Sequence, residues 1–198
     1  MSKKQNPRMG DSQGRFPSDQ SGSGRPERNH ERQPSSGSRI PSGLSLRQLD
    51  PRRFELVHPP CVERVMEDYL EALDAWRMGE PEEAKDMLRF ALEGCGDHLW
   101  VHCALGRMAL EVENNRDLAR GHFGYAFELV SRVIPQGFTG FLPVELPGNE
   151  PLYQAIEGLI SCEKLAGGAS SRQVVELERT RTRLSGSGPG GASPMSLR

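Results

Sequence analysis

The sequence of 198 residues contains no long apolar run, and only 6% of its residues are aromatic. A membrane-spanning helix needs about 20 consecutive apolar residues, so we expect no span. The segment at residues 1–15 has no apolar stretch of the kind found in secretory signals, which predicts that no such signal is cleaved. Hydrophobic residues make up 35%, below the roughly 45–50% of an average globular chain. We therefore expect part of the chain to be disordered.

Cysteine is scarce as well. The four cysteines include no Cys-x2-Cys pair and form no dense framework: they are Cys61, Cys95, Cys103 and Cys162. Closely spaced cysteines are typical of small secreted proteins that depend on disulfides. Their absence leads us to interpret all four residues as reduced thiols and to expect a cytoplasmic protein.

Motifs of the common catalytic and cofactor-binding classes do not occur in a suitable setting. The sequence has no Walker loop or HExxH pattern, and its matches to GxSxG at residues 10–14 and to GxGxxG at residues 186–191 lie in glycine-rich stretches without the strand-turn-helix context that these motifs require. Acidic residues are numerous, but most of them occupy positions that face solvent on the expected helices, so they do not indicate acid–base catalysis. The sequence predicts a protein that is not an enzyme and needs no cofactor.

The charges divide the chain into three segments of different sign. Residues 1–53 hold 11 Lys or Arg against 5 Asp or Glu, residues 54–166 hold 9 against 20, and residues 167–198 hold 5 against 2. The formal net charge of -2 therefore hides an acidic body between two basic flanks.

Both ends of the chain have the composition of disordered segments. Residues 1–53 and 184–198 are rich in small and polar residues and bury too little apolar surface to offset the conformational entropy of ordering. An alternative is that the basic N-terminal region binds nucleic acid or acidic lipid. Its arginines are scattered and Phe16 is the only aromatic residue between them that could stack on a base, which argues against nucleic acid as the main partner.

The body between these ends, residues 54–183, is predicted to be helical. From Pro59 onward apolar residues recur every three or four positions, and proline, glycine and capping residues mark the ends. We expect Asp97 to cap the third helix and Ser170 or Ser171 the sixth, and we expect no sheet. The expected helices are roughly 60–78, 81–93, 98–112, 117–134, 151–166 and 171–183, with an ordered connector at 135–150.

A pattern of small and large residues occurs twice in these helices. Ala84-x3-Leu88-x2-Ala91 recurs 35 residues later as Ala119-x3-Phe123-x2-Ala126. The helices before them correspond with a shift of 33, where Tyr69-x2-Ala72-Leu73-x2-Trp76 recurs as His102-x2-Leu105-Gly106-x2-Ala109. A period in this range is typical of stacked helical repeats.

This pattern resembles the tetratricopeptide repeat, a helix-turn-helix of 34 residues with the signature W-x2-L-G-x2-Y, A-x3-F and a final proline. Leu105-Gly106 begins the best copy, and Pro135 follows near its expected end. The resemblance covers roughly residues 60–183, with two clear copies and a degenerate third at 152–159. It implies an all-α fold of antiparallel helix-turn-helix repeats, a small α-solenoid.

In this family the first helix of each pair lines a concave groove that binds a protein or peptide. The resemblance therefore implies a set of partner-binding residues, which are Glu67, Leu70, Asp74, Arg77, Trp100 and Arg107, with Cys103 and Leu110 beside them. Trp and Arg are enriched at binding hot spots. The alternatives are that Trp100 only packs between repeats and that the arginines only offset their acidic neighbours.

One cluster has the composition of a metal site. Cys95, His98 and His102 lie within eight residues, and the two histidines are one helical turn apart. Zinc accepts such ligands, but a structural site draws on a second pair far along the chain, and the sequence shows none because Cys61 and Cys162 stand alone. We therefore predict no metal.

Two functional hypotheses follow. The first is a non-catalytic interaction module that binds a protein or peptide in the repeat groove. The alternative is a regulatory or nucleic-acid-associated protein that uses the basic N-terminal region, with the helices as a dimerisation body. The identity of the partner and the oligomeric state are left open by the sequence.

Overall fold

The computed structural model describes residues 43–167 and 171–186. They belong to one compact unit that spans Ile40–Arg198. Most of the two regions predicted to be disordered lies outside the described residues. Those predictions stay untested there.

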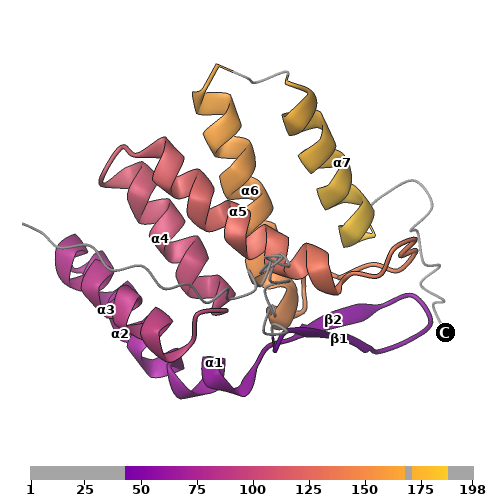
Figure 1. The fold of residues 1–198 in the computed structure, drawn as a ribbon, viewed down its shortest axis with the longest axis horizontal. Coiled ribbons are helices and arrows are strands. Elements are labelled where there is room, and N and C mark those ends of the chain that lie inside the picture. The colour runs from indigo at the N-terminus through magenta and orange to yellow at the C-terminus, as the bar shows by residue number, and fades with distance from the viewer. Residues whose placement is uncertain (1–42, 168–170, 187–198) are drawn as a thin grey trace, which may run out of the picture. The chain divides into compact units, whose positions relative to one another are not determined.

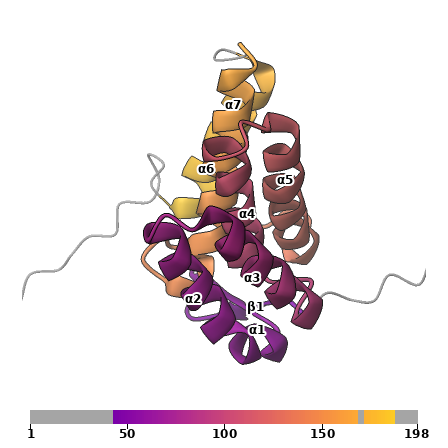
Figure 2. The ribbon, with the colours of Figure 1, turned by 90° about the vertical axis from the view of Figure 1, so that its left-hand side faces the viewer.

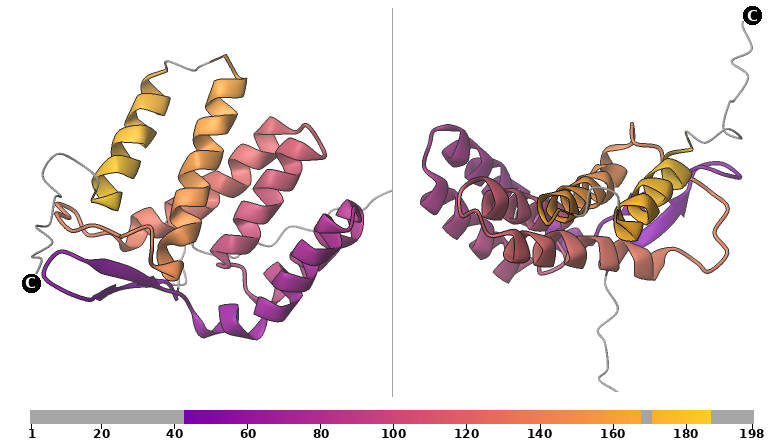
Figure 3. Two further views of the ribbon diagram at one scale, coloured as in Figure 1. Left: turned by 180° about the vertical axis from the view of Figure 1, so that it is seen from behind. Right: turned by 90° about the horizontal axis from the view of Figure 1, so that it is seen from above.

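The described residues contain seven α-helices, so the prediction of a mainly helical fold is confirmed. Figure 1 shows α2 and α3 at one side of the helical unit, α5 crossing in front of α6, and α7 at the other side, and Figure 3 shows the arrangement from behind. The helices are α1 Pro60–Arg64, α2 Met66–Arg77, α3 Pro81–Gly94, α4 Leu99–Glu111, α5 Arg116–Val133, the 3-10 helix η1 Pro147–Asn149, α6 Glu150–Leu165 and α7 Arg172–Ser185.

The first expected helix is interrupted. Val65 has φ −111° and ψ 13°, outside the helical region, and the chain bends there between α1 and α2. A Cβ atom on Gly94 would come within 2.7 Å of a methyl carbon of Val65, so the bend lies directly against the end of α3. The apolar period did not reveal the bend because it depends on this tertiary contact.

The helix ends largely follow the local sequence. Pro81 occupies the first turn of α3, where its missing N–H costs nothing. Asn115 caps α5 and Ser171 caps α7, each accepting a hydrogen bond from a backbone N–H three residues on. The expected cap of α4 is wrong, because His98 rather than Asp97 accepts the Val101 N–H.

A β-hairpin precedes the helices, so the expectation of no sheet is wrong. Strands β1 (Ser45–Gln48) and β2 (Phe54–Val57) pair antiparallel, with Leu46 opposite Leu56. The expected start of the helical domain at residue 54 falls inside this hairpin. Leu44 and Leu56 are buried in the core, which explains why so short and arginine-rich a segment is ordered.

Buried Asn149 fastens the hairpin to the helices. Its Oδ1 accepts the Leu56 N–H at 2.8 Å, and its Nδ2 donates to the carbonyls of Phe54 and Pro143. Asn149 is 0% exposed, and satisfying its polar atoms offsets the cost of burying them. Leu142 in the connector 135–150 is also fully buried, as expected for an ordered connector.

Successive helices pack as neighbours: α2 with α3, α4 with α5, α5 with α6, and α6 with α7. Helix α4 also contacts α3 and α6, so it lies at the centre of the helical unit. Figure 2 shows α2 and α3 beside α4, seen from the α2 side. This central position brings α4 next to the first helical pair, where the candidate site lies.

Phe123 of α5 fills the space between α4 and α6. It is 1% exposed, and its ring lies where a Cβ atom would stand on Gly106 or on Gly158. Phe123, the large residue of the repeated pattern, is thus buried between neighbouring helices. The absence of side chains at these two glycines lets a large ring fit between closely packed helices.

Candidate functional site

A surface pocket of about 270 Å³ opens between α2 and α4. Helix α2 contributes Leu73, Trp76 and Arg77 to its lining, and α4 contributes Arg107 and Glu111. Residues three or four positions apart share one face of a helix, so each helix directs one turn of side chains into the pocket. The pocket combines an aromatic ring, two cations and one carboxylate.

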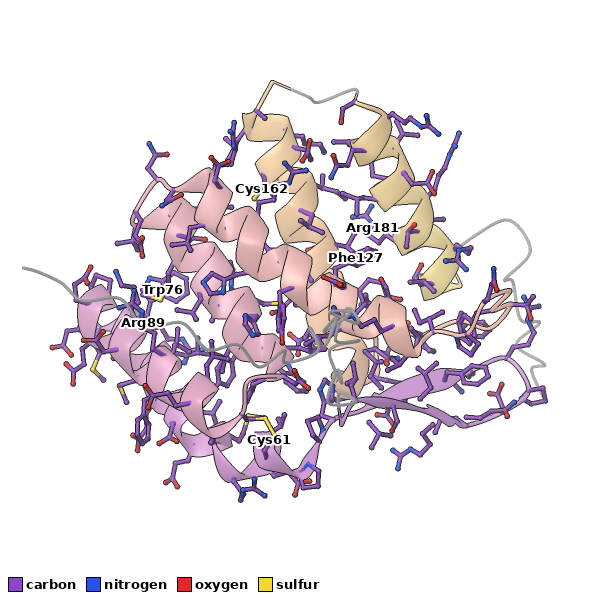
Figure 4. The ribbon with its side chains drawn as sticks, in the orientation of Figure 1. Cys61, Trp76, Arg89, Phe127, Cys162 and Arg181 are labelled. Carbon is purple, nitrogen blue, oxygen red and sulfur yellow. A yellow bond between two sulfur atoms is a disulfide. The ribbon has the colours of Figure 1, made fainter. Side chains whose placement is uncertain are left out.

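Arg107 lies across the indole ring of Trp76. Its guanidinium carbon is 5.6 Å from the ring centroid, within the range of a cation–π interaction. The Arg107 Nε atom is buried and has no hydrogen-bond partner. Figure 4 shows where Trp76 lies in the unit. The stacking restrains the Arg107 side chain and leaves a buried N–H without an acceptor beside the pocket.

Arg77 lies at the exposed side of the pocket. Its Nη1 is 2.6 Å from Oδ1 of Asp74, one turn earlier on the same helix. Both side chains are mostly exposed, at 72% and 62%, so this ion pair contributes little to folding. Arg77 can therefore exchange its partner for a carboxylate from another molecule at small cost.

The structure brings together two of the six predicted site residues, Arg77 and Arg107. Asp74 is next to them as the ion-pair partner of Arg77. Leu70 is 53% exposed on α2 and Glu67 is exposed near its start, but neither lines the pocket.

The remaining predicted positions on α4 have other surroundings. The Trp100 ring is partly buried and packs on the His58 ring at 4.3 Å between centroids. Cys103 is fully buried and its thiol donates to the Pro151 carbonyl, so its groove assignment is wrong. Leu110 lines a separate pocket near the α4–α5 turn.

Sequence reasoning missed three lining residues, namely Leu73, Trp76 and Glu111. Leu73 and Trp76 were assigned to the apolar stripe of their helix, which is correct for part of each side chain. The apolar stripe of α2 is wider than the surface that α3 and α4 cover, so the side chains at its edge remain accessible from the pocket. The available signal was Trp76 itself, because tryptophan is enriched at binding sites.

Four histidines gather around the start of α4. Burial lowers the pKa of His98 and His122 to about 4, and it also lowers the pKa of His58 and His102. His102 Nδ1 lies 3.2 Å from His122 Nδ1, so one nitrogen must carry a proton and the other must accept it. The lowered pKa values keep these side chains uncharged at neutral pH, where His98 and His102 are buried and His58 and His122 are partly buried.

Cys61 and Cys95 form a disulfide, shown as the yellow bond in Figure 4. The prediction of four free thiols is therefore wrong for these two residues and holds for Cys103 and Cys162, which are free and buried. The two partners are 34 residues apart, and the α2–α3 hairpin brings them together. The cytoplasmic expectation rested on free thiols and stays a prediction without that support.

Within residues 43–167 and 171–186, no group of three or more His, Cys, Asp or Glu side chains is arranged to hold a metal ion in this disulfide form. Among the same residues, no helix is both long and apolar enough to cross a membrane.

No protein-family model matches the chain, and no curated protein or solved structure matches it.

Proposed function

We propose that this chain is a non-catalytic interaction module of the tetratricopeptide-repeat type, which binds a peptide or protein partner at the pocket between α2 and α4. The single observation that carries the proposal is the meeting of Trp76, Arg77 and Arg107 in this pocket. Aromatic and arginine side chains at the centre of a recess are the usual anchors of protein interfaces.

The repeat assignment is supported by the order of packing. Helix α4 contacts α3 before it and α6 after it, and α5 contacts both α4 and α6. In stacked helical pairs, each pair contacts only its neighbours, and the first helices of the pairs lie side by side. The proposed pocket lies between the first helices of pairs one and two.

The chemistry of the pocket favours a peptide that carries a carboxylate next to an apolar side chain. Arg77 holds its present carboxylate partner in an exposed ion pair, and Arg107 has a buried N–H with no acceptor. An incoming carboxylate would accept charge-assisted hydrogen bonds from these two cations. Trp76 and Leu73 provide the adjacent apolar surface.

The proposal is tested by selecting binders from a random peptide library with the full chain as bait, then measuring the affinity of the enriched peptides by calorimetry. We expect Arg77→Ala to weaken binding by about tenfold or more, since a charge-assisted hydrogen bond contributes roughly 1.5–3 kcal/mol. Arg89→Ala is a matched control, because Arg89 forms the same i,i+3 ion pair with Asp86 on α3, outside the pocket.

Equal affinities of the parent, Arg77→Ala and Trp76→Leu proteins for every enriched peptide would refute the site. Binding that instead weakens steeply with salt and is lost without residues 1–42 would favour the alternative based on the basic N-terminal region.

A further inference from the structure

A mirrored motif surrounds the disulfide. His58-x2-Cys61 leads into α1, and Cys95-x2-His98 connects the end of α3 to the start of α4. Each half places an imidazole and a sulfur three residues apart, the same spacing as in the Cys-x2-Cys pairs of zinc-binding loops. The sequence alone did not reveal the motif, because nothing in it showed that residues 58–61 and 95–98 meet.

The fold brings the two halves together. The Cα atoms of Cys61 and Cys95 are 5.4 Å apart, so both sulfurs occupy one place. The rings of His58 and His98 both contact Trp100, with centroid distances of 4.3 and 5.8 Å. Each imidazole is thus three residues along the chain from one of the two bonded sulfurs, and Trp100 lies against both rings.

Each of the two imidazoles has a buried nitrogen without a hydrogen-bond partner. These atoms are Nδ1 of His58 and Nε2 of His98, and the His98 side chain is completely buried. Buried polar atoms are nearly always paired, so two such atoms in one region need an explanation. No other histidine nitrogen in the described ranges is both buried and without a hydrogen-bond partner.

His58 also has the second contact expected of a metal ligand. Its Nε2 lies 2.8 Å from the Gly148 carbonyl oxygen, which can only accept, so Nε2 carries the proton. The unpartnered Nδ1 is therefore the nitrogen with the lone pair. Metal-binding histidines typically donate their other ring N–H to a carbonyl or carboxylate in this way.

We infer that, when the disulfide is reduced, His58, Cys61, Cys95 and His98 form a tetrahedral Cys2His2 site for a zinc ion. Zinc prefers this ligand set and number in structural sites. In the disulfide form the two sulfurs are bonded to each other and only the two imidazoles are free, which agrees with the absence of a metal-holding group in the described part of that form.

The reaction between the two forms balances with a dithiol as reductant. The dithiol gives two electrons and two protons to the sulfur–sulfur bond and becomes a disulfide itself, which leaves Cys61 and Cys95 as thiols. On binding Zn²⁺ each thiol releases its proton. Two thiolates and two neutral imidazoles then form a site with no net charge, which suits a buried position.

One hydrogen bond changes in the process. His98 Nδ1 accepts the Val101 N–H at 3.4 Å in the disulfide form, a long contact. When Nε2 binds the metal, Nδ1 carries the proton and this cap bond is lost. In return the metal joins the segment before α2 to the α3–α4 turn, as the disulfide does, so the tie between them is kept under reducing conditions.

The test uses the full chain, reduced without oxygen and titrated with Co²⁺ as a spectroscopic substitute for zinc. We expect one Co²⁺ per chain, with the visible bands of a tetrahedral ion and a thiolate charge-transfer band. Cys61→Ser should weaken that band, and His98→Asn should reduce the affinity at least tenfold while keeping a side chain that can cap α4. Cys162→Ser and His122→Asn are the matched controls and should bind as the parent does.

The inference is overturned if the reduced parent shows no charge-transfer band, or if Cys61→Ser and His98→Asn bind Co²⁺ as the controls do. Should His98→Asn fail to fold, X-ray absorption of the zinc-loaded parent decides the question. Two sulfur and two nitrogen neighbours are expected, and any other ligand count rejects the site. These outcomes do not depend on peptide binding, so the proposed function is tested separately.

Discussion

The α2–α3 pair and the α4–α5 pair carry the same pattern of small and large residues but fill their interiors differently. In the first pair Ala84, Leu88 and Ala91 are all 0% exposed. In the second pair Ala119, Phe123 and Ala126 occupy the corresponding positions and are at most 1% exposed. The burial of both sets shows that the pattern marks the core in each pair, whichever large residue it contains.

The difference lies in what faces the large residue. The Phe123 ring occupies the places where side chains of Gly106 and Gly158 would be, whereas Leu73 stands in the first pair at the position that corresponds to Gly106. A larger residue on one helix is thus matched by smaller ones on its neighbours. The two helical pairs therefore bury the same pattern positions with residues of different size.

The largest expected effect comes from emptying the two equivalent positions. Phe123→Ala should lower the free energy of unfolding by about 3–5 kcal/mol, and Leu88→Ala by about 2–5 kcal/mol. We expect the Phe123 variant to lose more, because its ring contacts α4 and α6 as well as its own helix. Urea unfolding followed by circular dichroism measures both, and a loss below about 1 kcal/mol for Phe123→Ala would contradict the described packing.

A second substitution overfills the Phe123 site. A Cβ atom at Gly158 would come within 2.4 Å of the ring, so Gly158→Ala should cost about 1–3 kcal/mol as the helices move apart. Gly121→Ala is the control, because no atom beyond the adjacent backbone of α5 lies within 4 Å of its Cβ position. That control should stabilise the protein by roughly 0.5–1 kcal/mol, since alanine is the better helix former. Equal effects at both glycines would show that the ring does not occupy this space.

The pairs also differ in their response to acid. Tyr69 and Met87 of the first pair correspond to His102 and His122 of the second. Burial, followed by the neighbouring His102, lowers the pKa of His122 from 6.5 to about 4. The unfolded chain therefore binds the proton first, and stability should fall as the pH drops from about 6.5 towards 4.

Urea unfolding of the disulfide form at several pH values measures this effect. His122→Asn should show a shallower fall than the parent between pH 7 and pH 5. We expect a smaller loss than for Gly158→Ala, because His122 is only partly buried. Parallel curves for the parent and the variant would show that His122 is not the responsible group.

The smallest effect concerns the starts of the second helices. Asn115 caps α5 through a 3.0 Å bond from the Leu118 N–H, whereas the corresponding Glu80 makes no side-chain cap on α3. Asn115→Ala should therefore cost about 1 kcal/mol and Glu80→Ala markedly less. Thermal unfolding of the two variants gives the comparison, and equal melting temperatures would remove the assigned role of Asn115.

Local signals predicted the helices well and the candidate site only in part. Proline, glycine and capping residues start or end a helix through contacts with neighbouring residues in the sequence. Their effect on helix ends can therefore be predicted without knowing the fold. Arg77 and Arg107 were assigned to one groove from the repeat register. Trp76 was missed because an apolar stripe does not show where neighbouring helices stop covering it.

The amino-acid sequence by itself determined the helical body, the repeated core positions and the cap of α7. These depend on periodicity and on contacts within a few residues, where the chain has little choice. Only the tertiary structure decided the bend at Val65, the hairpin before the helices and the meeting of Cys61 with Cys95. Each of these depends on segments far apart in the chain, and no local preference encodes which of them will pack together once the apolar faces are buried.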